Sequence, residues 1–204
     1  MAETPRRSLR AEHMRQTRQA LITSARALFG DQGYAATSID QVVERAGVTS
    51  GALYHHFTTK AALFEAVFER EHDELLAASA GAAARSADPV EQLGLAFDSF
   101  LESVLRPDVQ RIIVTDGPAV LGPQRYAELD ERYAFGAIVH ALESATVART
   151  LVVDDVATLA RLLLGALTRG GMLVASSPTP QATRDAVSRT LRQVLDGLRP
   201  APPT

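Results

Sequence analysis

The sequence predicts an all-α protein with a small amino-terminal unit of three helices and a larger helical body. Apolar residues recur at helical spacing along most of the 204 residues, and caps, glycines and prolines divide them into about nine helices. Residues 147–153 have strand propensity, but no second run could pair with them, so we expect a loop with an extended piece. The expected parts are a flexible arm at 1–11, an amino-terminal domain at 12–58, a connecting helix at 59–80, a body at 81–199 and a disordered tail at 200–204.

The composition is typical of a folded protein, and we expect it in the cytoplasm. Apolar residues make up 46% of the chain and charged residues 22%. Cysteine is absent, which excludes disulfides, cysteine-bound zinc and thiol catalysis. No apolar run approaches the roughly 20 residues of a membrane span. No apolar segment follows the amino-terminal arginines, as it would in a secretory signal.

Charge is divided unevenly along the chain. The net charge is −3, but residues 1–60 carry eight Lys/Arg against five Asp/Glu, a net of +3, which leaves −6 for residues 61–204. A basic end on an acidic body indicates a protein that touches nucleic acid at one end only.

The first helix is expected at about 12–29, where an apolar stripe precedes a Gly-rich break. Arg15 and Arg18 lie near its start and are candidates for phosphate contacts. The residues before it carry three arginines without helical periodicity. They form either a disordered tail or an arm that reaches DNA.

Residues 37–60 predict two short helices joined by a tight turn, which is a helix-turn-helix. Ser38 and Gln41 make a capping pair at the start of the first helix. Gly47 is placed to end that helix in the left-handed conformation.

The second helix of this unit is expected to show a polar face. Thr49 or Ser50 can cap it, and Leu53 and Phe57 lie one turn apart on the side that would be buried. Its other side carries small and hydrogen-bonding side chains, which suit base edges and phosphates. Lys60, the only lysine of the chain, follows a cap in a first helical turn, where an ammonium group can clamp a phosphate.

The pattern T-S-I…A-G-V-T-S-G-A-L-Y-H-H-F-x-x-K-x-x-L resembles the DNA-binding domain of TetR-family transcriptional regulators. The resemblance covers roughly residues 15–75 and implies binding to double-stranded DNA. The alternative is a helical corner that binds nothing, as many all-α proteins contain. The resemblance implies these DNA-contacting residues: Ser38, Thr49, Ser50, Gly51, Ala52, Tyr54, His55, His56 and Lys60.

The body is expected to hold the remaining helices. The connecting helix has two apolar faces and fades through the alanine-rich stretch 77–87, where we expect a loose corner. Asp88 and Pro89 begin a helix that ends before Pro107. A short buried helix and a turn-rich segment at 116–123 come next. Three further helices are expected at about 123–149, 154–175 and 180–198.

An apolar set with a few polar members is the candidate ligand cavity, because small-molecule pockets combine an apolar lining with a few placed polar groups. The alternative is an ordinary bundle core. The segments TDGPAVLG and LLLGAL also resemble the ligand-binding half of some TetR-family members. The candidate cavity residues are Phe97, Phe100, Leu101, Val104, Asp116, Tyr126, Tyr133 and Met172, with Arg169 and His140 as weaker ones.

The last two predicted helices carry more apolar surface than one bundle face requires, which indicates a dimer interface. Glycines at 165, 170 and 171 would let two backbones approach closely. The resemblance implies a four-helix interface of this kind, and the alternative is that these helices complete the monomer core. The candidate interface residues are Leu159, Leu162, Leu163, Ala166, Leu191, Val194 and Leu195.

We expect no enzyme, cofactor or metal site, because no nucleophile motif, phosphate loop or paired metal-ligand spacing is present. The charged stretch 69–74 is expected to be a solvated helix face. The expected function is a ligand-responsive transcriptional regulator, most simply a repressor, that binds a palindromic operator as a homodimer and is released by a small, largely apolar inducer. The resemblance implies that the ligand moves the connecting helix and separates the two DNA-binding heads. Alternatives are a regulator controlled by a protein partner, and a small-molecule carrier or enzyme with a vestigial head.

Overall fold

The computed structural model describes residues 5–200, and that part of the chain contains helices and loops but no strand. This confirms the predicted all-α class. The elements are α1 (Pro5–Gln32), α2 (Ile39–Ala46), α3 (Ser50–His56), α4 (Lys60–Ala83), α5 (Pro89–Val104), α6 (Pro107–Val109), the π-helix η1 (Gln110–Asp116), α7 (Gly117–Asp130), the π-helix η2 (Glu131–Phe135), α8 (Gly136–Val147), α9 (Val156–Ala175) and α10 (Pro180–Gly197).

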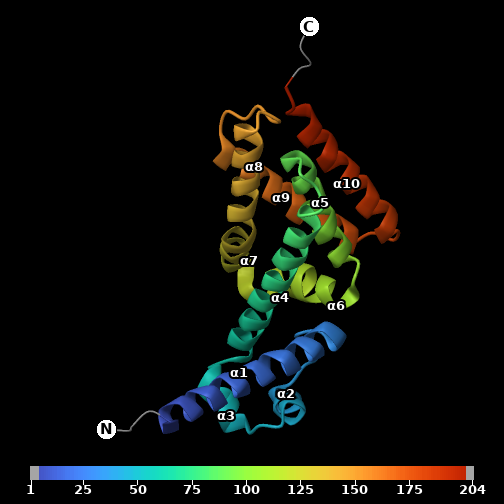
Figure 1. Cartoon of the computed structure of the whole chain (residues 1–204). Coiled ribbons are helices and arrows are strands. Elements are labelled where there is room, and N and C mark those ends of the chain that lie inside the picture. The colour runs from blue at the N-terminus through green and yellow to red at the C-terminus, as the bar shows by residue number, and fades with distance from the viewer. Residues whose placement is uncertain (1–4, 201–204) are drawn as a thin grey trace.

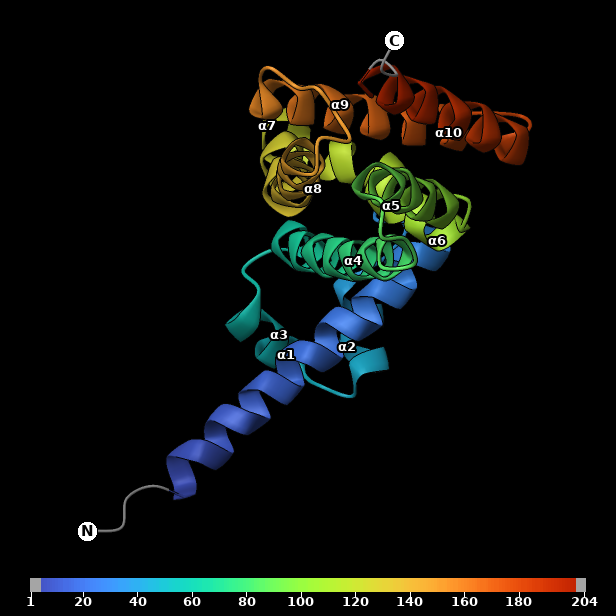
Figure 2. The same cartoon turned by 45° about the horizontal axis from the view of Figure 1, so that its top comes forward.

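The helices form two parts joined by one long helix. Helices α1, α2 and α3 make a head at one end, and α4 leaves the head and runs into a body made of α5 to α10 (Figure 1). Helices α9 and α10 lie side by side on the side of the body away from the head (Figure 2). The loop expected at 147–153 is confirmed, since no helix or strand covers residues 148–155.

Helix α1 begins earlier than expected. It starts at Pro5 rather than near residue 12, so the part of the expected flexible arm from residue 5 onward is helical. Proline fits a first helical position, and residues 6–11 contain no glycine or further proline to interrupt the helix. The predictions for residues 1–4 and 201–204 lie outside the described residues.

The head does not have a core of its own. Phe29 of α1, Tyr34 of the following loop and Phe64 of α4 pack as an aromatic group with ring centroids 5.3–5.7 Å apart. The same buried cluster continues into the body through Ile112 of η1 and Leu129 of α7. Because a three-helix head is marginal by itself, this shared core ties the head's position to the body.

The segment expected to be turn-rich is instead helix α7. Its sharp break comes at Gly122, with φ 76° and ψ 161°. Gly117 is buried, and a Cβ there would lie 2.7 Å from the Phe68 ring, so this glycine allows α7 to pack closely on α4. Close packing of α7 on α4, rather than a turn, therefore explains why residue 117 is glycine.

Two of the glycines in α9 also serve packing within the monomer. A Cβ on Gly170 would lie 2.6 Å from Val187 of α10, and one on Gly171 would lie 3.3 Å from Phe100 of α5. Of the three, Gly165 alone faces open space. The expectation that all three serve a contact between two copies is therefore wrong.

Helix α9 is the one helix in the described part of the chain that is long and apolar enough to cross a membrane, with a mean hydropathy of 1.3, although no apolar run of that length was expected. One side of α9 packs on α5, α8 and α10. Its other side carries exposed apolar residues such as Leu162 and Leu173, so packing within the monomer accounts for only part of its composition.

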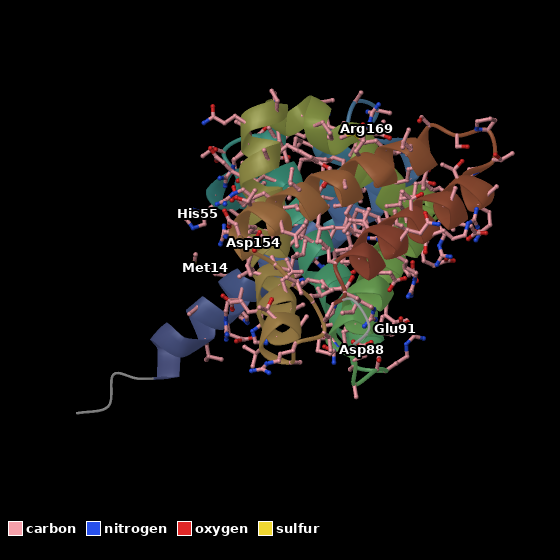
Figure 3. The ribbon with its side chains drawn as sticks, turned by 90° about the horizontal axis from the view of Figure 1, so that it is seen from above. Met14, His55, Asp88, Glu91, Asp154 and Arg169 are labelled. Carbon is pink, nitrogen blue, oxygen red and sulfur yellow. The ribbon has the colours of Figure 1, made fainter. Side chains whose placement is uncertain are left out.

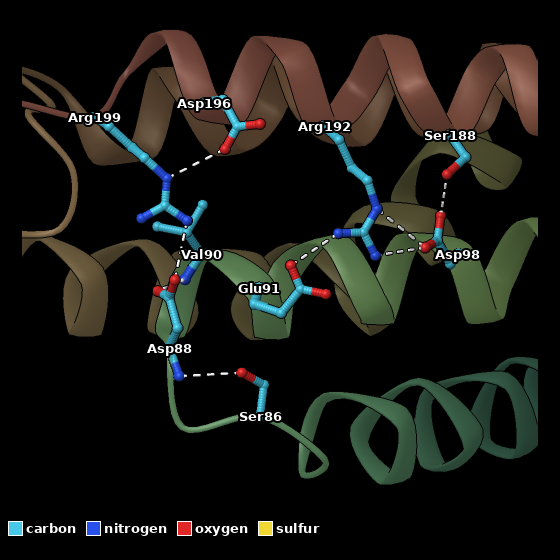
Figure 4. A network of polar contacts seen from close by, with 9 residues as sticks. All are labelled: Ser86, Asp88, Val90, Glu91, Asp98, Ser188, Arg192, Asp196 and Arg199. Carbon is cyan, nitrogen blue, oxygen red and sulfur yellow. Dashed lines mark hydrogen bonds and ion pairs between the residues drawn. The ribbon is translucent and has the colours of Figure 1, made fainter.

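Ion pairs fasten α10 to α5 (Figure 4). The guanidinium of Arg192 bonds Asp98 at 2.6 Å and Glu91 at 2.9 Å. A Cβ on Gly94 would lie 2.8 Å from that guanidinium, so glycine leaves the room that Arg192 occupies. A second pair joins Arg199 to Asp88 at 2.9 Å, where α5 begins.

Candidate functional site

Local hydrogen bonds fix both ends of α2. At its start, the backbone N–H of Ser38 donates to Gln41 Oε1 at 2.8 Å, and the N–H of Gln41 donates back to Ser38 Oγ at 3.2 Å, which confirms the predicted capping pair. At its end, Gly47 has φ 66°, the left-handed conformation expected of it, and the N–H of Val48 in the turn donates to the Val43 carbonyl at 3.1 Å. Local chemistry thus sets where α2 begins and ends and where the turn to α3 starts.

Helix α3 presents a polar face to solvent. Thr49, not Ser50, caps it, because Thr49 Oγ1 accepts the N–H of Ala52 at 3.2 Å. Leu53 and Phe57 are buried as expected. His55 points away from the protein (Figure 3). Among the residues implied by the resemblance, the exposed ones are Ser38, Thr49, Ser50, Gly51, Tyr54 and His55, and the half-buried ones are Ala52, His56 and Lys60.

A basic neighbour supports this face from α1. The Arg18 guanidinium lies 5.2 Å from the centroid of the Phe57 ring. Burial lowers the pKa of His56 below its usual value, and the charges of His55 and Arg18 lower it further. The uncharged form of His56 is therefore favoured, and Arg18 is the permanent cation at this edge of α3.

Lys60 lies in the first turn of α4 after the Thr59 cap, as predicted, but its side chain is turned toward the loop before α2. Its Nζ donates to the carbonyl oxygens of Tyr34 at 2.7 Å and Thr37 at 2.8 Å, and it lies 4.1 Å from the centroid of the Tyr34 ring. These contacts tie the first residue of α4 to the loop before α2. The ammonium group is thus already engaged in holding the head.

Asp116 does not line the candidate cavity, contrary to expectation. Its Oδ2 accepts the backbone N–H of Tyr34 at 2.7 Å, and Arg111, on the same π-helix, donates to the carbonyl oxygens of Gly30 at 3.0 Å and of Asp31. Together they satisfy backbone groups where α1 ends. The π-helix η1 of the body is therefore hydrogen-bonded to the end of α1 and to the loop that precedes the helix-turn-helix of α2 and α3.

The charged stretch on α4 is not uniformly solvated. Glu71 is 2% exposed and accepts from Arg26 at 2.8 and 3.1 Å, while Arg26 also pairs with Asp108 at 2.8 Å. The prediction of a solvated face is wrong for Glu71 and for His72, which is also buried. Both turn inward because α1 and η2 cover this side of α4.

The body contains a cavity lined mainly by apolar side chains from α4, α5, α7, η2, α8 and α9. Phe97, Phe100 and Tyr133 line it as expected. The full lining is His72, Leu75, Leu76, Ser79, Ala96, Phe97, Phe100, Asp130, Tyr133, Ala134, Ala137, Ile138, Leu164, Leu167 and Thr168.

The other predicted cavity residues lie elsewhere. Leu101 and Val104 are core residues, 0% and 1% exposed. Tyr126 and Met172 line a shallower groove beside α9, where Arg169 is exposed (Figure 3). This groove adjoins the cavity and shares Asp130, Leu164 and Thr168 with it. His140, the other weaker candidate, lies in a further groove along α8.

Four polar residues of the cavity, His72, Ser79, Asp130 and Thr168, were not among the predicted residues. Thr168 Oγ1 donates to Asp130 Oδ2 at 2.7 Å, and Asp130 Oδ1 lies 3.7 Å from His72 Nε2. His72 Nδ1 bonds the Phe68 carbonyl at 3.2 Å. The sequence did contain one indication of the position of His72: it lies one turn after the apolar Phe68 and so shares the buried face of that helix.

The predicted dimer residues differ in exposure. Leu162 of α9 and Val194 of α10 are 67% and 47% exposed, and Ala166, one turn after Leu162, is also exposed. Leu159 is half-buried. Leu163, Leu191 and Leu195 are core residues at 2%, 6% and 1% exposure, so they cannot be offered to a partner.

Comparison with known proteins agrees with this two-part arrangement. Residues 21–67 match the family model for bacterial regulatory proteins of the tetR family, and residues 90–198 match that for the tetracyclin repressor-like C-terminal domain. A TetR-family transcriptional regulator from Pectobacterium atrosepticum superposes with a TM-score of 0.83 at 29% identity, covering 94% of this chain and 98% of the other.

Curated relatives match over shorter stretches. The transcriptional activator FasR of Mycolicibacterium smegmatis is 30% identical over 112 residues, 55% of this chain and 51% of that protein. The transcriptional repressor KstR2 of Mycobacterium tuberculosis is 29% identical over 116 residues, 56% of this chain and 58% of that protein. The chain thus spans about half the length of these relatives, which are regulators and not enzymes. Since the family models together match most of its residues, the chain belongs to the TetR family of bacterial transcriptional regulators.

Proposed function

We propose that this protein is a cytoplasmic transcriptional regulator that binds a palindromic DNA operator as a homodimer and responds to a small, largely apolar molecule. Regulators of its family bind DNA operators and typically act as dimers with small-molecule ligands. Repression is the simplest mode, because a protein bound at an operator blocks transcription unless it also recruits the polymerase.

The observation that carries the proposal is the polar outer face of α3 on a head that the body holds in place. Ser50, Gly51 and His55 are exposed on a helix short enough to enter a major groove. Tyr54 is 54% exposed next to them, so its ring and hydroxyl group are accessible to DNA. We assign Ser50 and His55 to base edges and Tyr54 to phosphates.

The dimer is assigned to the exposed apolar side of α9 and α10, which is centred on Leu162, Ala166 and Val194. The two α3 helices of a two-fold dimer can enter major grooves on the same side of the DNA if the centres of the half-sites lie one helical turn apart, about 34–36 Å, or a whole number of turns apart. A ligand that shifts α4 changes this separation, because α4 carries the head at one end and lines the cavity at the other.

Selection from a pool of random DNA duplexes tests the proposal without knowledge of the operator. The full-length protein should enrich an inverted repeat, and His55→Ala should change the enriched sequence. The matched control is His140→Ala, which removes another exposed histidine from the body and should leave the enriched sequence unchanged. Retention of no sequence above a random background would refute DNA recognition, and enrichment of a single half-site would refute the dimer.

A further inference from the structure

The ligand cavity does not end at its polar residues but continues along α4. A second hollow lies beside it, and the two share the residues Leu76, Ser79, Ala96, Phe97, Ala137 and Ile138. The first has a volume of about 90 Å³, which is small for an organic ligand, and the second has about 370 Å³. A ligand held at the first hollow therefore has room to extend toward the second, with which it shares six lining residues, twice the three that it shares with the groove beside α9.

The second hollow lies along the alanine-rich stretch 77–87, where a loose corner was expected. That expectation is wrong for residues 77–83, because α4 continues as a helix to Ala83. Helices α4 and α8 both pack on α5 but make little close contact with each other. Ala80 and Ala83 of α4 line the space between them, opposite Ala141 and Ser144 of α8. Because these side chains are too short to meet, a groove remains, which we call the alanine groove.

The first hollow supplies a polar end. His72 is 6% exposed, and its Nε2 has no hydrogen-bond partner in the described part of the chain, since Asp130 Oδ1 is 3.7 Å away. Asp130 is held from its other oxygen by Thr168. A ring nitrogen of a buried histidine and a carboxylate oxygen, 3.7 Å apart, are thus both available to one ligand group that lies against the two of them.

The charges around the two hollows determine which polar group of a ligand can bind there. Asp130 is the only carboxylate that lines either hollow, and among the described residues no lysine or arginine lines them. An anionic group would meet an uncompensated negative charge, whereas an ammonium or hydroxyl group can donate to Asp130.

We propose that the inducer is an elongated amphiphile. Its hydrogen-bond-donating head, best a monocation, lies against His72 Nε2 and Asp130 Oδ1, and its apolar tail lies in the alanine groove. From His72 to Ala83 the helix rises about 16 Å, which sets the scale of the tail. This inference rests on the proposed ligand-responsive function and adds the shape and charge of the ligand.

Calorimetric titration of the full-length protein with three probes tests the inference. Decylammonium has both head and tail, butylammonium has the head with a short tail, and decanoate has the tail with an anionic head. Below their micellar concentrations, decylammonium should bind at least about tenfold more tightly than either of the others, which is the effect of one good charged contact or of several buried methylenes. Equal affinity for decanoate, or no binding of any probe, would overturn the inference.

Variants separate the head contact from the tail contact. Asp130→Asn keeps an acceptor for Thr168 but removes the charge, and it should abolish the preference for decylammonium over decanoate. Ala80→Leu, at the edge of the alanine groove, should weaken decylammonium at least about fivefold and leave butylammonium unchanged. Ala78→Leu is the matched control, because Ala78 is exposed on the same helix and lines neither hollow. If Ala80→Leu and Ala78→Leu behaved alike, the tail would not lie in the groove.

Failure of this inference is distinguishable from failure of the proposed function. Selection of DNA needs no ligand, so enrichment of an inverted repeat without binding of any probe would refute the amphiphile alone. Tight binding of decylammonium by a protein that enriches no DNA would refute the regulator alone.

Discussion

Removing the charge of Lys60 should loosen the head rather than simply remove a phosphate contact. Lys60→Met keeps the aliphatic stem and deletes the ammonium group. That group donates to the carbonyl oxygens of Tyr34 and Thr37 at 2.7 and 2.8 Å and lies 4.1 Å from the centroid of the Tyr34 ring. Its loss removes this partner from the Thr37 carbonyl and leaves the Tyr34 carbonyl with only the Thr37 N–H, at 3.3 Å.

The magnitude follows from these contacts. A hydrogen bond to a charged group contributes about 1.5–3 kcal/mol, and a cation–π contact at a partly exposed site about 0.5–1 kcal/mol. Because Lys60 is half-buried and water can replace part of what is lost, we expect a decrease of about 2–3 kcal/mol in the free energy of unfolding. For a chain of this size the melting temperature should fall by about 4–12 °C.

Two measurements separate the structural role from the phosphate role. Thermal unfolding followed by circular dichroism should show the decrease for Lys60→Met. Arg45→Met, an exposed cation on α2, should change the free energy of unfolding by no more than about 0.5 kcal/mol. The slope of log affinity for DNA against log salt should change by clearly less than the roughly 0.9 of one phosphate contact. An unchanged melting temperature together with a slope reduced by about one would refute the reasoning.

Three further outcomes follow from burial, charge and capping. Leu163→Glu, at a residue 2% exposed, should unfold the protein, whereas Leu162→Glu, at a residue 67% exposed, should keep its helicity and give monomers in sedimentation; a folded Leu163→Glu monomer would contradict the core assignment. Burial alone would raise the pKa of Asp108, but its two arginine partners outweigh this and lower it to about 2. Since that value lies below the unfolded pKa of about 3.9, the contribution of Asp108 is full above about pH 4 and is lost as the pH falls toward 2. Between about pH 4 and pH 2 the free energy of unfolding should therefore fall less steeply for Asp108→Asn than for the wild type. Identical curves for the two proteins would exclude the ion pair. Ser38→Ala removes one half of the capping pair and should lower the free energy of unfolding by about 1 kcal/mol in urea titrations, and no change would show that Gln41 suffices.

The caps of α2 and the buried face of α3 were predictable because the residues that produce them lie within a few positions of one another. Ser38 and Gln41 meet across one helical turn, and Gly47 ends α2 for a reason that belongs to its own backbone. The buried face of α3 followed from Leu53 and Phe57 being one turn apart. Conversely, the start of α1 was missed because no sequence feature between Pro5 and residue 12 stops or begins a helix by itself.

The sequence by itself determined the all-α class, the helix-turn-helix and the outer face of α3, since helical periodicity and capping are short-range properties. Only the tertiary structure decided what Lys60 and Asp116 bind, because their partners lie 23 or more residues away along the chain. It also decided that Leu163 is core while Leu162 is surface. Adjacent residues on a helix differ by about 100° in direction, and a helix that is apolar on several sides gives no sign of which side meets the bundle. The polar end of the cavity could not be predicted from the sequence either, because His72, Asp130 and Thr168 come from three different helices that only folding brings together.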